Sequence, residues 1–386
     1  MSESNIFWDC DKTACKEFME EFKEISGYTD FNFKYNWRIN FPEIEDYLSR
    51  LLYSSYSRNK DQNRDLIRKL PELIHYMEDF FAQSIKDGLI TKVNISNILG
   101  RLKNDQSGLR AIMPLPEKGL FGKSIRDTIE INLNMERHGN SPSLSKDDLI
   151  RLYLYHEVGH KILNIHSNEV AIDNYLDTVD AILQEKGIVE PDTFMKDVIP
   201  DGLLMIEECL TQELAERLTY EILGKKRPTI KPRNEIANIQ GGVPEICQVP
   251  TNHDFYGIFQ QPTIEFGKTL RGCHNRISTN EDVLLNMISK ALYTNFDEDL
   301  FREYYKGDGS LYQDLFRTLR AMGLLLDQKY ASFGQGKPIK GVTSESCITA
   351  ISRMAARNED MRPYPQGGFS KIEYGKYRVT GFQPIL

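Results

Sequence analysis

The segment from Ser145 to Leu163 constrains this chain more than any other. Ser145 and Asp148 have the capping-box spacing that begins a helix, and helical periodicity continues to Leu163. This predicted helix contains the run His156-Glu157-Val158-Gly159-His160. Because four residues advance a helix by about 400°, the two histidines project from one face, one turn apart. The spacing therefore predicts a pair of imidazoles that can bind a single metal ion.

The chemistry of this pair points to zinc. Two neutral imidazoles bind Zn²⁺ at about 2.0–2.1 Å each, and the adjacent Glu157 can reach a water molecule at an open coordination position. An alternative is that the two histidines align on a helix without binding metal. An alternating strand pattern before the helix, at Asp127–Asn134, and acidic helices after it favour the metal interpretation. A catalytic zinc site needs a third protein ligand.

A second predicted helix, from Leu203 to Leu223, supplies two candidates for that ligand. Its apolar residues repeat at helical spacing, and Glu207 and Glu208 lie among them. Burying a carboxylate is costly unless it is paired or bound to a metal. At about 100° per residue, Glu207 falls near the middle of the apolar arc and Glu208 near its edge. Periodicity alone therefore favours Glu207.

The combination of this histidine motif with Glu208-Cys209-Leu210-Thr211 resembles the glutamate zincins, or gluzincins, a class of zinc metallopeptidases. On the later helix of that family, the ligand glutamate is followed by a small residue and, two positions further, by Ser or Thr. The resemblance implies that His156, His160 and Glu208 hold Zn²⁺ and that Glu157 is the general base. It also implies a peptide or protein substrate, whose peptide bond is hydrolysed by zinc-activated water.

His166 is an alternative third ligand. Its spacing from His160 matches the zinc motif of the metzincins, in which a glycine lets the chain leave the helix sharply. This sequence has Leu163 at that position, and Asn164 can partly substitute because Asn tolerates the left-handed conformation. The sequence thus leaves Glu208, Glu207 and His166 in competition.

The wider pattern predicts an α+β fold that is mostly helical. We expect an N-terminal helical region over residues 1–115, a zincin-like core over 116–330 and an irregular C-terminal segment packed on the core over 331–386. In the core, Ile129, Ile131 and Leu133 alternate, which predicts a strand with one buried face. The resemblance implies that this strand is the edge of a small sheet above the active-site helix, where an extended substrate pairs by strand addition.

Composition excludes several classes of function. The chain has 386 residues, with 48 Lys and Arg against 56 Asp and Glu, which gives a formal charge of −8. An acidic balance argues against nucleic-acid and anionic-membrane binding. No apolar run approaches the roughly 18–20 residues of a membrane span, and the N-terminus lacks a secretory pattern. We expect a cytoplasmic protein, with unconventional export as the alternative. The six cysteines are scattered without a CxxC pair, so they predict neither a disulfide framework nor a structural zinc site.

Other residues supply alternatives for the mechanism. Zincins add a Tyr, His or Arg that stabilises the oxyanion, and Tyr256, His253 and Arg271 are the candidates here. Two further functions compete with peptide hydrolysis: an inactive zincin-like binding or regulatory module with a structural zinc, and a zinc hydrolase that acts on a non-peptide amide or ester. Cleavage specificity and oligomeric state do not follow from the sequence.

Overall fold

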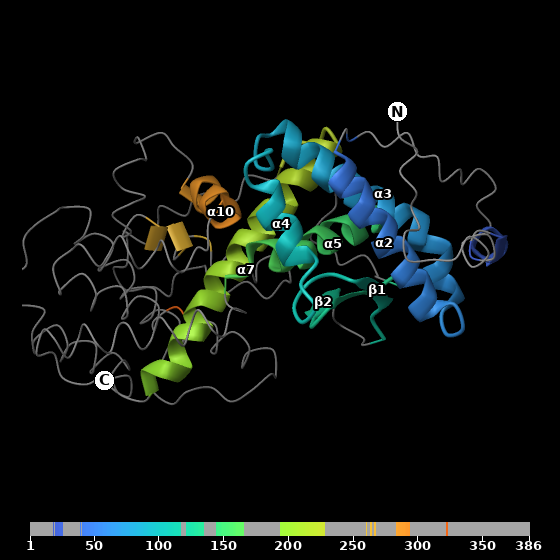
Figure 1. Ribbon diagram of the computed structural model, residues 1–386. Helices are drawn as coiled ribbons and strands as arrows, with labels where there is room; N and C mark the ends of the chain where they lie inside the picture. Colours follow the sequence, from blue (N-terminus) through green and yellow to red (C-terminus); the bar gives the residue numbers. More distant parts are fainter. Residues whose placement is uncertain are drawn as a thin grey trace, which may run out of the picture. The chain divides into compact units, whose positions relative to one another are not determined.

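The computed structural model describes residues 41–116, 121–134, 144–165, 194–227 and 283–293, with side chains of the fourth range described from Gly202 onward (Figure 1). It also describes Phe18, residues 20–25, Ile39, Met322 and five positions between 260 and 267. The chain divides into two compact units, Met1–Leu163 with Thr211–Arg227 and Asn164–Leu210 with Pro228–Leu386. The described residues are mostly helical and include a small three-stranded sheet, which confirms the α+β prediction.

The N-terminal half of the first unit includes the helices α2 (Pro42–Asn59), α3 (Arg64–Lys86) and α4 (Ile95–Leu102). Helix α3 begins at a cap, in which the Asn63 side chain accepts a hydrogen bond from the Leu66 N–H at 2.9 Å, and the helix continues through Pro71. The apolar faces of α2 and α3 pack on each other and form much of the core.

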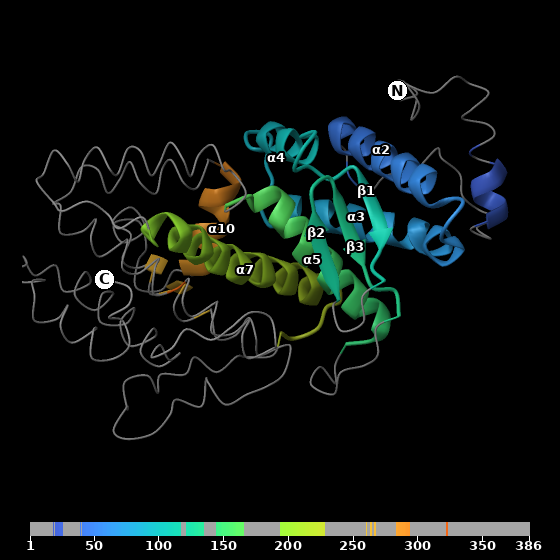
Figure 2. The same ribbon diagram turned by 90° about the horizontal axis from the view of Figure 1, so that it is seen from below.

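The sheet contains β1 (Ala111–Pro114), β2 (Gly122–Ile125) and β3 (Thr128–Ile131) in the order β1-β3-β2 (Figure 2). Strand β3 pairs parallel with β1 and antiparallel with β2. Ile129 and Ile131 are fully buried, as their alternation predicted, but Leu133 lies beyond the end of β3 and is only partly buried. The prediction that this strand is the edge was wrong, because β3 is central. Alternation reports which face of a strand is buried and carries no information about how many neighbours it has.

The two edges of the sheet differ. At β1, the Ile112 N–H donates to Ser55 Oγ at 2.9 Å, and the Ile112 carbonyl accepts from Asn59 Nδ2 at 3.1 Å. Helix α2 therefore satisfies the outer backbone groups of β1 with its own side chains. Strand β2 forms the opposite edge and leads into β3 through a two-residue turn, in which Arg126 has a φ of 44°.

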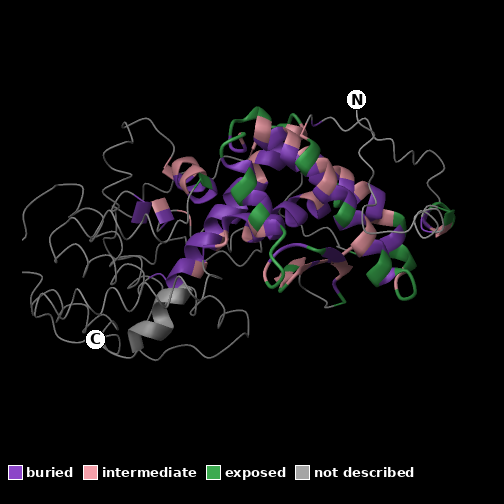
Figure 3. Cartoon of the chain, in the orientation of Figure 1, coloured by how far each residue is buried: buried purple, intermediate pink, exposed green. Residues whose placement is uncertain are grey.

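Helix α5 (Lys146–Leu163) has the predicted bounds and packs against β2, β3, α3 and α4. The capping box is present: the Ser145 N–H donates to Asp148 Oδ2 at 3.0 Å, and the Asp148 N–H donates to Ser145 Oγ at 3.1 Å. Beyond the last turn, Asn164 has a φ of 48°, the left-handed conformation expected for it. After its exposed first turn, nearly all of α5 is buried (Figure 3).

Helix α7 (Phe194–Ile222) begins nine residues before the predicted Leu203. It ends where predicted: Gly224 has a φ of 59°, and the Lys225 N–H returns to the Tyr220 carbonyl at 3.0 Å. A further helix, α10, spans Val283–Tyr293. Across the described ranges, no helix combines the length and apolar character required to cross a membrane. The predicted segment boundaries at 115/116 and 330/331 stay predictions.

Candidate metal centre

The two histidines of α5 converge on one point. Their Nε2 atoms lie 3.1 Å apart, and the rings are 4.8 Å apart between centroids and nearly perpendicular. Two nitrogen ligands of a tetrahedral zinc ion lie about 3.3 Å apart at normal bond lengths. His156 is 2% exposed, and His160 is partly buried. Both imidazoles thus present a nitrogen to the same small volume, at a separation that suits one metal ion.

Glu208 joins this pair. The ligand atoms of His156, His160 and Glu208 all lie within 4.8 Å of one another, so these three residues could hold a metal ion. Residues 194–222 form one continuous helix, which fixes Glu208 relative to Thr211, one turn further on. The donor set is two imidazole nitrogens and one carboxylate oxygen, which is the combination that three-ligand zinc sites use.

Glu207 has a different partner. Its side chain is fully buried, as the periodicity indicated, and its Oε2 accepts a hydrogen bond from the Ile165 N–H at 2.6 Å. Ile165 follows the left-handed Asn164, where the chain leaves α5. Among the described residues, the group gathered for a metal contains Glu208 and does not include Glu207. The Ile165 N–H thus compensates the cost of burying the Glu207 carboxyl group in the apolar arc.

Glu157 lies between α5 and the edge strand. It is 6% exposed and is covered by β2 at Gly122. A β-carbon on Gly122 would lie 2.8 Å from both Cγ and Oε1 of Glu157, closer than real side-chain contacts. Sequence reasoning missed Gly122, although a glycine inside a strand often marks a place where another group approaches the backbone closely.

Comparisons with protein-family models, curated proteins and solved structures found no match to this chain. The chemistry of the site is therefore the basis for its function. His166, His253, Tyr256 and Arg271 lie outside the described residues. His166 as third ligand and the oxyanion candidates consequently stay predictions. Cys209, next to Glu208, is a buried thiol, and the other five cysteines lie outside the described residues.

Strand β2 is held on α5 at both ends. Phe121, just before the strand, stacks on Tyr153 with 4.5 Å between ring centroids and 13° between planes. Burial raises the pKa of the Tyr153 hydroxyl, and the nearby Glu216 carboxylate adds to the shift. At the other end, the Lys161 ammonium donates to the Arg126 carbonyl in the hairpin turn. These contacts fix β2 across the turn of α5 that carries Glu157.

A second glycine sets the approach of α7 to α5. A β-carbon on Gly159 would lie 3.0 Å from both Cβ and Cγ2 of the fully buried Thr211. Helix backbones approach this closely only where one of them presents a small residue. Gly159 directly precedes His160, so this contact lies beside the candidate metal ligands of α5.

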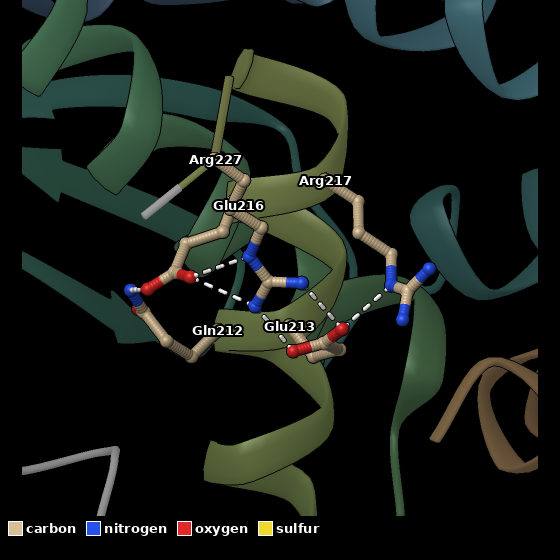
Figure 4. A network of polar contacts seen from close by, with 5 residues as sticks. All are labelled: Gln212, Glu213, Glu216, Arg217 and Arg227. Atoms are coloured by element: carbon tan, nitrogen blue, oxygen red, sulfur yellow. Dashed lines mark hydrogen bonds and ion pairs between the residues drawn. The ribbon is translucent and has the colours of Figure 1, made fainter. Parts of the chain in front are cut away.

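The next turns of α7 carry a network of charges (Figure 4). Arg227 Nη1 donates to Glu213 Oε1 at 2.6 Å, and its Nε and Nη2 donate to Glu216 Oε2 at 3.0 and 2.8 Å. Gln212 Nε2 donates to the other Glu216 oxygen at 2.8 Å, and Arg217 Nε donates to Glu213 at 2.6 Å. Burial alone would lower the pKa of Arg227, but the two glutamates outweigh it and raise that pKa. The network braces α7 beyond Thr211.

Proposed function

We propose that this chain is a zinc-dependent metallopeptidase with a zincin-like core. In this proposal His156, His160 and Glu208 hold Zn²⁺, and Glu157 is the general base. The observation that carries the proposal is the convergence of the three ligand atoms within 4.8 Å, with Glu157 on the helix that carries both histidines. A metal site without catalysis needs no carboxylate at this position.

A zinc ion bound there would polarise the substrate carbonyl and lower the pKa of its bound water. Glu157 would accept a proton from the attacking water and pass it to the leaving amine. Two features of the chain suit this role. The side chain is buried, which excludes competing bulk water, and the glycine at 122 leaves space for the carboxylate under β2.

The edge of the sheet supports a peptide substrate. The Asn132 N–H donates to the Phe121 carbonyl at 2.9 Å, so Phe121, Lys123 and Ile125 direct their backbone groups toward β3. By alternation, the N–H and C=O of Gly122 and Ser124 point away from β3, to an edge where the described residues include no further strand. The opposite edge is covered by α2. An extended peptide paired with β2 would therefore lie beside Glu157.

The test is hydrolysis of a defined peptide mixture by the purified chain, followed by mass spectrometry. We expect cleavage that a zinc chelator abolishes and that added Zn²⁺ restores. Glu157→Gln should abolish cleavage and retain bound zinc, because it removes only the proton acceptor. Asp147→Asn, on the exposed first turn of α5, is the control and should cleave normally.

Two results would contradict the proposal. Cleavage that persists in Glu157→Gln would exclude this carboxylate as the base. A wild-type chain that binds zinc tightly and cleaves no peptide would favour a structural zinc in a binding module.

A further inference from the structure

Two contacts, one within α5 and α7 and one just after the end of α5, bracket His160 and Glu208 in the sequence. On one side Gly159 packs on Thr211, and on the other Glu207 accepts the Ile165 N–H at 2.6 Å. His160 follows Gly159 directly, and Glu208 follows Glu207 directly. His160 and Glu208 therefore each lie next to a residue that contacts the other helix or the chain that leaves it.

The contact at Glu207 has a demanding local structure. Asn164 ends α5 in the left-handed conformation, and this turn brings the Ile165 N–H to Glu207 Oε2. Glu207 and Ile165 are both fully buried, so the hydrogen bond is made away from water. Hydrogen bonds from a backbone N–H to an ionised carboxylate are among the stronger ones, and a buried carboxylate without compensation is costly. The pair therefore favours a single arrangement of the α5 exit against α7.

We propose that Glu207 is the positioning residue of the metal centre: by accepting the Ile165 N–H, it holds the exit of α5 on α7 and keeps Glu208 within reach of both histidines. Glu207 acts through Glu208 and contributes no ligand atom. This inference rests on the proposed metal site. It assigns different roles to the two neighbouring glutamates, with Glu208 as ligand and Glu207 as positioning residue. Groups that orient metal ligands contribute strongly to affinity, and their loss typically weakens binding about 10–100-fold.

The adjacent glutamates allow a matched experiment. Each protein is stripped of metal and titrated with Zn²⁺ in competition with a chromophoric chelator. The series compares wild type with Glu207→Ala, Glu207→Gln and Glu208→Gln. Glu207→Gln keeps an oxygen that accepts the Ile165 N–H and should bind Zn²⁺ almost as tightly as wild type. Glu207→Ala loses that acceptor and should bind about 10–100-fold more weakly. Glu208→Gln loses a charged ligand and should show the largest loss.

Three outcomes would overturn the inference. If Glu207→Gln loses as much affinity as Glu208→Gln, Glu207 is itself a ligand. If Glu207→Ala binds Zn²⁺ like wild type, the hydrogen bond has no positioning role. If wild type binds no Zn²⁺, the metal site itself is refuted. Should Glu207→Ala fail to fold, the two isosteric glutamine variants still decide between ligand and positioning residue.

Hydrolysis is measured separately on the same preparations. A wild-type chain that binds Zn²⁺ without cleaving peptides contradicts the peptidase proposal, and the affinity series then still tests Glu207. The converse outcome is that wild type cleaves peptides while Glu207→Ala binds Zn²⁺ as tightly as wild type does. That result refutes only the positioning role of Glu207.

Discussion

The backbone of Gly122 on β2 lies directly against the carboxylate of Glu157 on α5, so that a β-carbon on Gly122 would come 2.8 Å from Oε1. Any other residue would have to displace either the strand or the carboxylate. Because Phe121 and the turn after Ile125 both anchor β2 to α5, the strand has little freedom to move away. The carboxylate is therefore the group that shifts.

Gly122→Ala should consequently lower kcat for the proposed hydrolysis by about 10- to 100-fold, since small displacements of a catalytic group have effects of this size. Its Zn²⁺ affinity should remain that of wild type, because the proposed metal site takes no ligand from Glu157. Ser124→Ala, at the next position on the same face of β2, is the control and should retain kcat. Steady-state kinetics and zinc titration of both variants check this, and a wild-type kcat in Gly122→Ala would contradict it.

Gly159→Ala should destabilise the fold, although alanine is normally the better helix residue. The new methyl group would lie 3.0 Å from the Thr211 side chain, and such overpacking costs about 1–3 kcal/mol. Gly100 on α4 has no atom within 4 Å of the corresponding position, so Gly100→Ala should stabilise by about 0.5–1 kcal/mol. Urea unfolding measures the free energy of unfolding of both variants. An equal increase in the two variants would show that α5 and α7 do not constrain each other at Gly159.

Ser55→Ala should destabilise the fold, because it removes a hydrogen bond between α2 and the β1 edge of the sheet. Ser55 Oγ accepts the Ile112 N–H at 2.9 Å, and its removal leaves a buried donor unpaired at a cost of about 1–3 kcal/mol. Ser57, two residues away on the same helix, is exposed, so Ser57→Ala should change the unfolding free energy by less than about 0.5 kcal/mol. Similar unfolding free energies for the two variants would mean that water or another group replaces Ser55.

Features set by local interactions were predicted well from the sequence. The bounds of α5 follow from the capping box at Ser145 and from apolar periodicity, and both lie within the segment itself. The buried face of β3 follows from the alternation of Ile129 and Ile131. The convergence of His156 and His160 follows from helix geometry alone. In each case, the information lies within one element.

Features that depend on distant partners were not predicted. Strands β1 and β2 have four residues each and no clear alternation, and the groups that cover Ile112 come from 53 and 57 positions away. The choice between Glu207 and Glu208 depends on what each meets across the helix interface. Periodicity correctly indicated that Glu207 is buried, but it cannot reveal that the Ile165 N–H compensates the buried charge.

Acid should remove the contribution of one ion pair in the β2–β3 turn. Arg58 donates to Asp127 Oδ2 at 2.7 Å and holds the pKa of that carboxyl below its ordinary value, against the opposing effect of partial burial. A lowered pKa in the folded state contributes stability above the unfolded pKa of about 3.9, and this is lost as the pH falls through the folded pKa. The pair is partly exposed, so the contribution is at most about 1 kcal/mol.

Asp127→Asn should therefore be less stable than wild type near neutral pH, and the difference should disappear below the folded pKa. Urea unfolding near neutral pH and at about pH 3 measures this difference, with moderate salt reducing it at neutral pH. A difference that persists unchanged in acid would assign the effect to the turn conformation rather than to charge.

Arg227→Met should weaken the end of α7 more than Arg217→Met does. Arg227 contacts both Glu213 and Glu216, whereas Arg217 contacts Glu213 alone among the residues of this network (Figure 4). Glu213 is 4% exposed, so losing its bidentate partner leaves a buried charge less compensated. Hydrogen bonds to charged groups contribute about 1.5–3 kcal/mol, and we expect a loss in this range for Arg227→Met and a smaller one for Arg217→Met.

Methionine retains much of the apolar stem of arginine, so these substitutions separate the effect of charge from the effect of packing. Urea unfolding of both variants checks the order, and a larger loss in Arg217→Met would show that Arg217 is the principal partner of Glu213.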